Sequence, residues 1–156
     1  MNKKYIAAIV VILFFSASIV LYGDIGGKTG RTLKSSTAGC GSCHGSSANS
    51  GVSVIISGPD TLNTGQTAQY LVTVTMTGKT GAGFDIAKRK GTLSPVSSNV
   101  HLSSTEIVHS TNIAMTSGSA TVSFNYTAPS IESVDTIWAT GLATNSSGGT
   151  GGDSWN

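Results

Sequence analysis

The sequence predicts an all-β fold in which two sheets pack face to face as a β-sandwich. Its 156 residues include 20 glycines but only three prolines, with abundant serine and threonine, which favours strands joined by turns. Apolar and polar residues alternate with a period of two in several short segments. No long amphipathic helix is visible beyond the N-terminal segment, so the pattern favours strands in the rest of the chain.

The alternation places the predicted strands one after another from residue 51 onward. In the longest, Tyr70, Val72 and Val74 share one face, while threonines occupy the other. The glycine-rich stretch 78–83 is expected to form a turn, so that the next strand begins at Phe84. The predicted strands cover residues 52–56, 70–76, 84–87, 92–96, 107–109, 122–126 and 136–143. Short strands separated by turns are typical of an immunoglobulin-like sandwich, here a domain over residues 51–156.

The N-terminus is expected to direct export. Residues 1–5 include the basic pair Lys3-Lys4, and Ile6 to Leu21 is almost wholly apolar. This pattern is typical of a secretory signal peptide, here over residues 1–23. The apolar run is nearly long enough to span a bilayer, so an uncleaved N-terminal anchor is the alternative. In either case the rest of the chain is expected in the periplasm, at the cell surface or outside the cell. Membrane contact is expected only if the segment stays uncleaved.

Residues 24–39 are rich in glycine, serine and threonine and show no helical period. They are therefore expected to form a flexible or partner-docked arm. Without Lys3 and Lys4, basic and acidic side chains balance at seven each, and no basic patch rich in aromatic residues is present. Nucleic acid is therefore not an expected partner.

One short motif carries chemistry. The only two cysteines, Cys40 and Cys43, are separated by two residues, and His44 follows at once. This is the C-x-x-C-H spacing of covalent haem attachment. The two thiols can add to the vinyl groups of the ring, and the adjacent imidazole can bind the iron. We therefore expect one covalent haem c on an attachment loop over residues 40–50, N-terminal to the sandwich.

Three other interpretations of the cysteine pair remain open. A local disulfide would suit an exported protein, but it leaves the histidine unexplained, and closing so short a loop gains little chain entropy. A thioredoxin-like redox pair would need a strand before it and a helix after it, whereas both flanks favour loop. A structural zinc site would need four ligands, and the chain has no second cysteine pair.

The order of short motifs along the chain resembles a known family, the exported bacterial choice-of-anchor V domain proteins, which are similar to reeler-type β-sandwiches. The resemblance covers residues 39–153 and implies a reeler-like sandwich with a haem-attachment motif at its N-terminal edge. A tryptophan often precedes the Thr-Ala-Pro element of that family, whereas Tyr126 stands there in this chain. After the C-x-x-C-H, the motifs that carry the resemblance are Gly58-Pro59, residues 64–67, residues 81–85, residues 108–111, residues 124–129, residues 138–145 and Gly152-Asp153.

The sixth ligand of the iron has several candidates. Met76 shares the face of a predicted strand with core residues and is expected to be core. Met115 lies in a turn-like stretch, and His101 lies in a polar loop where a solvated histidine is the default. His109 is preferred because it matches the family's histidine followed by a hydroxyl residue, and its apolar neighbours can cover the ring. The predicted metal ligands are therefore His44 and His109, with His101 and Met115 left open.

These features predict a monohaem c-type cytochrome that transfers electrons outside the cytoplasmic membrane and is not an enzyme. Its fold is not the helical one of small soluble cytochromes c. The expected partners are a redox protein or an extracellular electron acceptor. A homopolymer, in which the 24–39 arm docks on a neighbour and the haems form a conductive chain, is a further prediction. The alternatives are an adhesion module with a structural haem, and a haem sensor or peroxidase with an open distal site.

Overall fold

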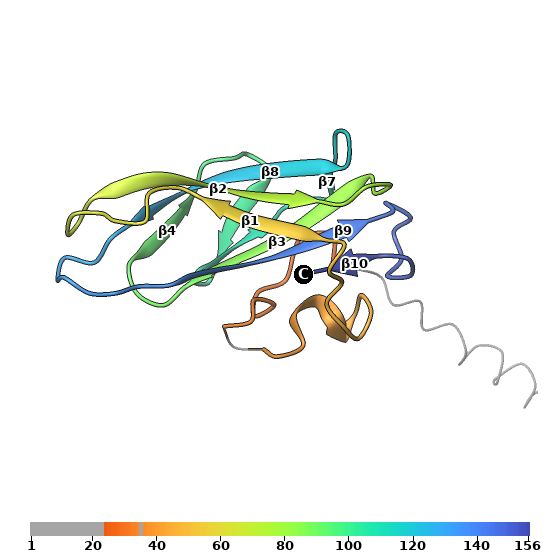
Figure 1. The fold of residues 1–156 in the computed structure, drawn as a ribbon, viewed down its shortest axis with the longest axis horizontal. Helices are drawn as coiled ribbons and strands as arrows, with labels where there is room; N and C mark the ends of the chain where they lie inside the picture. The colour runs from red at the N-terminus through yellow and green to blue at the C-terminus, as the bar shows by residue number, and fades with distance from the viewer. Residues whose placement is uncertain (1–23, 35) are drawn as a thin grey trace, which may run out of the picture.

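The structure is a computed structural model that describes residues 24–34 and 36–156, and it confirms an all-β sandwich. Two antiparallel sheets pack on each other (Figure 1). The first has the order β1 (Ser53–Ser57), β2 (Thr67–Thr75), β8 (Ser119–Thr127), β4 (Thr92–Pro95). The second has the order β10 (Ser154–Trp155), β9 (Ile137–Thr144), β3 (Gly81–Lys88), β6 (Glu106–His109), β5 (Val100–Ser103), and β7 (Ile113–Ala114) also pairs with β3.

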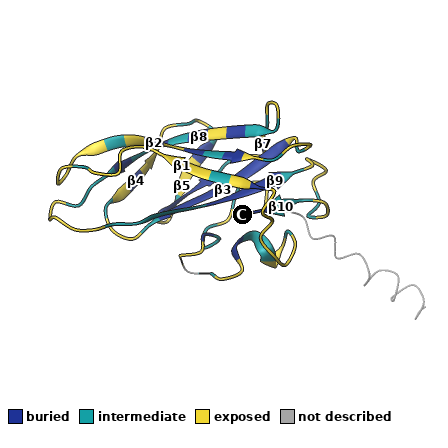
Figure 2. Cartoon of the chain, in the orientation of Figure 1, coloured by how far each residue is buried: buried dark blue, intermediate teal, exposed yellow. Residues whose placement is uncertain are grey.

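The core lies between the two sheets, as the alternation predicted. Tyr70 and Val72 of β2 are buried together with Phe124 of β8, while the residues between them are more exposed (Figure 2). The rings of Tyr70 and Phe124 stack with their centroids 5.7 Å apart. From the second sheet Phe84 and Ile86 enter the same core. Since side chains alternate along a strand, Gly83 and Asp85 lie on the outer face of that sheet.

Strand β3 is longer than the glycine pattern predicted, because it begins at Gly81 rather than at Phe84. A Cβ atom at Gly81 would lie 2.3 Å from Asn112 Oδ1, and one at Gly83 would lie 2.8 Å from the His109 ring. The glycines therefore serve close approach of side chains to a strand, not a turn.

Three short strands were not predicted from the pattern. Strand β5 runs through His101, which the polar composition had placed in a loop; only Val100 of this strand is buried. Strands β7 and β10 have two residues each, which is too short to show any period. Trp155 of β10 pairs with Leu142 of β9, so the end of the chain forms one edge of the second sheet.

The structure describes most of the segment that was expected to form a flexible or partner-docked arm, and there the segment packs on its own chain. Residues 24–34 and 36–39 lie against the second sheet of the same chain, below β9 and β10 in Figure 1. Gly27 lies so close to β6 that a Cβ there would be 2.6 Å from the His109 carbonyl oxygen. Thr32 is fully buried. Hydrogen bonds from its backbone to two buried carboxylates hold this segment.

The expected signal peptide or anchor over residues 1–23 lies outside the described residues. Within residues 24–34 and 36–156, no helix has the length and apolar character to cross a bilayer. The one helical element in that part of the chain is a short 3₁₀ turn, η1 (Gly39–Ser42), which carries the first cysteine.

Candidate functional site

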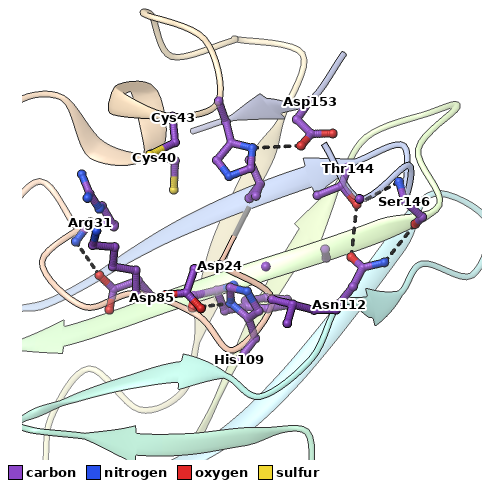
Figure 3. A pocket seen from close by; sticks show the side chains of 18 of the residues that line it. Asp24, Arg31, Cys40, Cys43, Asp85, His109, Asn112, Thr144, Ser146 and Asp153 are labelled. Atoms are coloured by element: carbon purple, nitrogen blue, oxygen red, sulfur yellow. Dashed lines mark hydrogen bonds and ion pairs between the residues drawn. The ribbon is translucent and has the colours of Figure 1, made fainter. Parts of the chain in front are cut away.

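A cavity of about 510 Å³ lies on the outer face of the second sheet, and it brings together residues that are far apart in the sequence. Its volume falls within the range of small-molecule and cofactor sites. Cys40, Cys43, His44 and His109 all line it, and Figure 3 shows the two cysteines on one side and His109 on another. All four residues predicted to attach or ligate a haem therefore border a single cavity.

The C-x-x-C-H segment is held in place by contacts with the last strand, β10. The backbone turns sharply at η1, where His44 N–H donates to the Cys40 carbonyl oxygen at 3.0 Å. The Trp155 ring packs against this turn, so close that a Cβ at Gly39 would lie 2.4 Å from it. Trp155 Nε1 also donates to the Gly45 carbonyl oxygen at 3.0 Å. Because Trp155 belongs to β10, the second sheet positions the motif.

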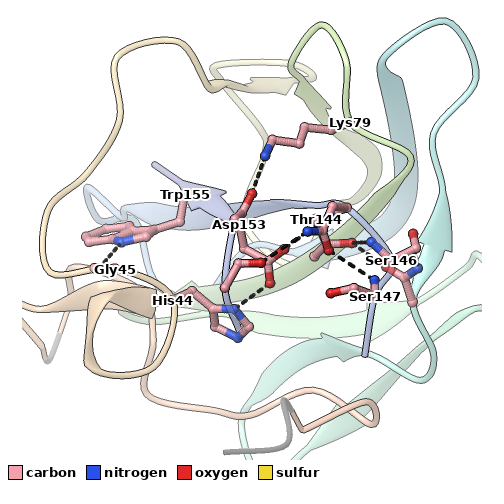
Figure 4. A network of polar contacts seen from close by, with 12 residues as sticks. His44, Gly45, Lys79, Thr144, Ser146, Ser147, Asp153 and Trp155 are labelled. Atoms are coloured by element: carbon pink, nitrogen blue, oxygen red, sulfur yellow. Dashed lines mark hydrogen bonds and ion pairs between the residues drawn. The ribbon is translucent and has the colours of Figure 1, made fainter. Parts of the chain in front are cut away.

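The imidazole of His44 is oriented by a buried carboxylate. Its Nδ1 lies 2.9 Å from Asp153 Oδ2, a residue 109 positions away in the sequence (Figure 4). The Asp153 side chain is only 2% exposed, and its other oxygen accepts the Asn145 N–H at 3.2 Å. In the neutral ring a carboxylate at Nδ1 favours the tautomer with the proton on that nitrogen, so Nε2 is the nitrogen available to a metal.

His109 lies at the end of β6, where β3 passes from pairing with β6 to pairing with β7. Its Nδ1 lies 3.0 Å from the Phe84 backbone nitrogen and 3.1 Å from the Phe84 carbonyl oxygen. The ring therefore occupies the gap in the ladder, where Nδ1 either accepts the Phe84 N–H or donates to the Phe84 carbonyl oxygen. The donating tautomer is the one that leaves Nε2 free to bind a metal. Burial lowers the pKa of His109, so the ring is favoured in its neutral form, which is the form that binds metals.

The two thiols are not bridged, and their surroundings differ. Cys43 is exposed, whereas burial raises the pKa of Cys40 to about 12, with the nearby charge of Asp85 acting in the same direction. Catalytic redox cysteines need a lowered pKa because the thiolate is the nucleophile. The environment of Cys40 therefore argues against a thioredoxin-like pair.

The other candidates for the sixth ligand lie elsewhere. His101 is exposed on β5, where its Nδ1 is 3.1 Å from Ser110 Oγ. Met76 and Met115 are partly buried and pack against the hydrophobic core. None of these three residues lines the cavity. Of the candidates named from the sequence, His109 alone joins His44 there.

Two buried carboxylates fasten the 24–34 segment beside the cavity. Asp85 Oδ2 accepts the backbone N–H groups of Arg31 at 2.7 Å and of Thr32 at 3.1 Å. Glu106 Oε2 accepts the Gly30 N–H at 2.6 Å. Burial raises the pKa of Asp85 to about 7; the neighbouring Glu106 adds to the rise, and the Arg31 N–H opposes it.

This arrangement predicts a pH-dependent stability. The pKa of Asp85 in the folded chain lies above that of an unfolded aspartate, about 3.9. Its protonation therefore stabilises the fold below about pH 4, and this contribution, roughly 4 kcal/mol at most, is lost as the pH rises to about 7. In Asp85→Asn, whose amide oxygen still accepts both N–H groups, we expect the free energy of unfolding to vary less between pH 4 and 7. Urea titrations across this range measure it. Asp60→Asn, an exposed site, should keep the wild-type slope, and an unchanged slope in Asp85→Asn would contradict the assignment.

Sequence reasoning missed the residues that orient the histidines. Asp153 was named only as part of the last motif of the family resemblance, without a role, and no spacing rule connects it with His44. The backbone of Phe84 carries no signal at all. Comparisons of the chain with protein-family models, with curated proteins and with solved structures find no match, so the family resemblance stays a prediction.

Proposed function

We propose that this chain is an exported monohaem c-type cytochrome that transfers electrons by an outer-sphere route. The observation that carries the proposal is the convergence of Cys40, Cys43, His44 and His109 on one cavity. Two thiols can attach the ring of haem c, and imidazoles are ligands that haem iron accepts. The resemblance drawn from the sequence points to the same chemistry.

The residues around the cavity fit such a group. The two cysteines would hold the ring edge as thioethers, His44 would bind the iron through Nε2, and His109 would supply the second imidazole. The backbone of Ala82, Gly83 and Phe84 forms the floor, and Leu142 adds an apolar wall. When bound, haem c supplies a one-electron iron couple. The chain's own part is to fix both imidazoles, to exclude water from the floor and to leave the Cys43 edge exposed to a partner.

The test is covalent haem in exported protein. Produced in a host that attaches haem c, the wild-type chain is expected to gain the mass of one haem and to show a reduced c-type visible spectrum. Cys40→Ala with Cys43→Ala should lose the covalent mass entirely, whereas Ser42→Ala, between the two, should keep it. The bare polypeptide mass in the wild-type protein would end the proposal.

Export, an electron-exchanging partner and polymerisation belong to the same proposal. In the single chain residues 24–34 pack on their own sheet, so docking of this segment on a neighbour would require it to leave that sheet. Imaging of concentrated holoprotein tests this directly: filaments would support a conductive chain, and dispersed monomers would leave a carrier that meets its partners singly.

One observation favours a second candidate, a haem sensor or peroxidase with an open distal side. The Asp153 carboxylate makes His44 a stronger electron donor, which assists chemistry at an open sixth position. In that case His109 would stand over the iron without binding it. The spectrum of the oxidised protein separates the two, since two bound imidazoles give a low-spin six-coordinate iron.

A further inference from the structure

The cavity has two chemically different ends, and β3 connects them. Gly81, Gly83 and Asp85 lie along one face of this strand. Asp85 lies at the end with Arg31 and Cys40, and a Cβ at Gly83 would touch the ring of His109. Gly81 lies against Asn112 and Thr144. Four residues of extended strand span about 13 Å, so the cysteine end and the Asn112 end are separated by roughly the length of a porphyrin.

The end remote from the cysteines is built of neutral hydrogen-bonding side chains. Asn112, Thr144 and Ser146 gather there, away from the thiols of Cys40 and Cys43 (Figure 3). Thr144 Oγ1 donates to Asn112 Oδ1 at 3.1 Å, and Asn112 Nδ2 donates to Ser146 Oγ at 2.9 Å. The two hydrogen bonds form a series in which Thr144 donates to Asn112 and Asn112 donates to Ser146.

The hydroxyl of Ser146 accepts two hydrogen bonds and keeps its own proton available to donate. Its Oγ accepts from Asn112 Nδ2 and also from Thr80 Oγ1 at 3.0 Å, which occupies both lone pairs. Within the described residues no protein group accepts its own proton; Ser146 lines the cavity and is exposed, so the proton is free for solvent or a ligand. The backbone of Gly148 and Gly149 borders the same end. Such a site suits an acceptor that brings lone pairs and negative charge.

We propose that Ser146 and Asn112 bind the propionate carboxylates of the haem, opposite the edge that the cysteines hold. This inference rests on the proposed function and adds the orientation of the group in the cavity. The vinyl and propionate groups lie on opposite edges of the porphyrin. The cysteines that would take the vinyl groups and the hydrogen-bonding side chains that would take the propionates likewise lie at opposite ends of the cavity. Asp153 also lines the cavity, and its two carboxylate oxygens are engaged by His44 Nδ1 and the Asn145 N–H.

The experiment compares two probes in full-length chain carrying Cys40→Ala and Cys43→Ala, where binding is reversible. Ferric haem and its dimethyl ester, which lacks the carboxylates, are titrated into this background with and without Ser146→Ala. We expect Ser146→Ala to weaken haem binding about tenfold and to leave the ester unaffected, because a bond to a charged acceptor is lost only with haem. Equal effects on both probes, or none on either, would overturn the assignment.

A second readout uses the intact holoprotein. The propionate bending bands in its resonance Raman spectrum are expected to shift in Ser146→Ala. Ser119→Ala is the matched control, since its hydroxyl also bonds a threonine but does not line the cavity. Unshifted bands in Ser146→Ala overturn the inference while covalent haem stands. Absence of covalent haem from the wild-type protein overturns the proposed function instead, so the two failures are distinct.

Discussion

Replacing His109 by alanine is expected to convert the holoprotein from a low-spin, six-coordinate iron to a high-spin or water-ligated one. The reason is geometric: His109 borders the cavity with its Nδ1 against the Phe84 backbone, which leaves Nε2 as the remaining ring nitrogen. The charge-transfer region of the oxidised visible spectrum measures the change. In His109→Met we expect the reduction potential to rise, within the roughly 0.8 V over which axial ligands set haem potentials.

His101→Ala is the matched control for this substitution. His101 lies on the neighbouring strand β5, exposed and bonded to Ser110, and it does not border the cavity. Its removal should leave the visible spectrum unchanged. A far-ultraviolet circular dichroism spectrum equal to that of wild type would show that His109→Ala is folded. An unchanged visible spectrum in folded His109→Ala would show that His109 does not bind the iron, and would favour the sensor or peroxidase with an open distal side.

Asp153→Asn is expected to raise the reduction potential. The buried carboxylate, 2.9 Å from His44 Nδ1, increases the electron donation of the imidazole and so favours the ferric state. An amide keeps the shape and loses the charge. If the relative affinity for the two oxidation states changes tenfold, the midpoint shifts by about 60 mV. Spectroelectrochemical titration of wild type and variant measures the shift.

The controls for Asp153→Asn separate charge from loop anchoring. Lys79 donates from Nζ to the Gly152 carbonyl oxygen, so Lys79→Met loosens the same loop without touching the carboxylate. It should not reproduce the upward shift. Asp153→Glu, which restores a carboxylate, should recover part of the wild-type potential. A potential that stays at the wild-type value in Asp153→Asn would mean that this hydrogen bond does not tune the iron.

Local patterns predicted the strands that are long enough to show a period. In β2 and β8 the alternation placed Tyr70, Val72, Phe124 and their neighbours in the core, and they lie there. The pattern failed where packing overrides local preference. Gly81 and Gly83 have the composition of a turn, yet both lie in β3. They are glycines because Asn112 and His109 occupy the space that a side chain would need.

The sequence by itself determined the all-β class, through alternation along the chain, and the thiol–thiol–imidazole motif, through spacing within five residues. Both are local, and local order is visible without a fold. The tertiary structure decided which distant groups meet: it places His109, already preferred from the family resemblance, at the cavity and His101 away from it, and it alone places Asp153 on His44 and residues 24–34 on Asp85. Those contacts depend on the register and packing of strands that are remote in the chain, and no spacing in a single sequence encodes such distances.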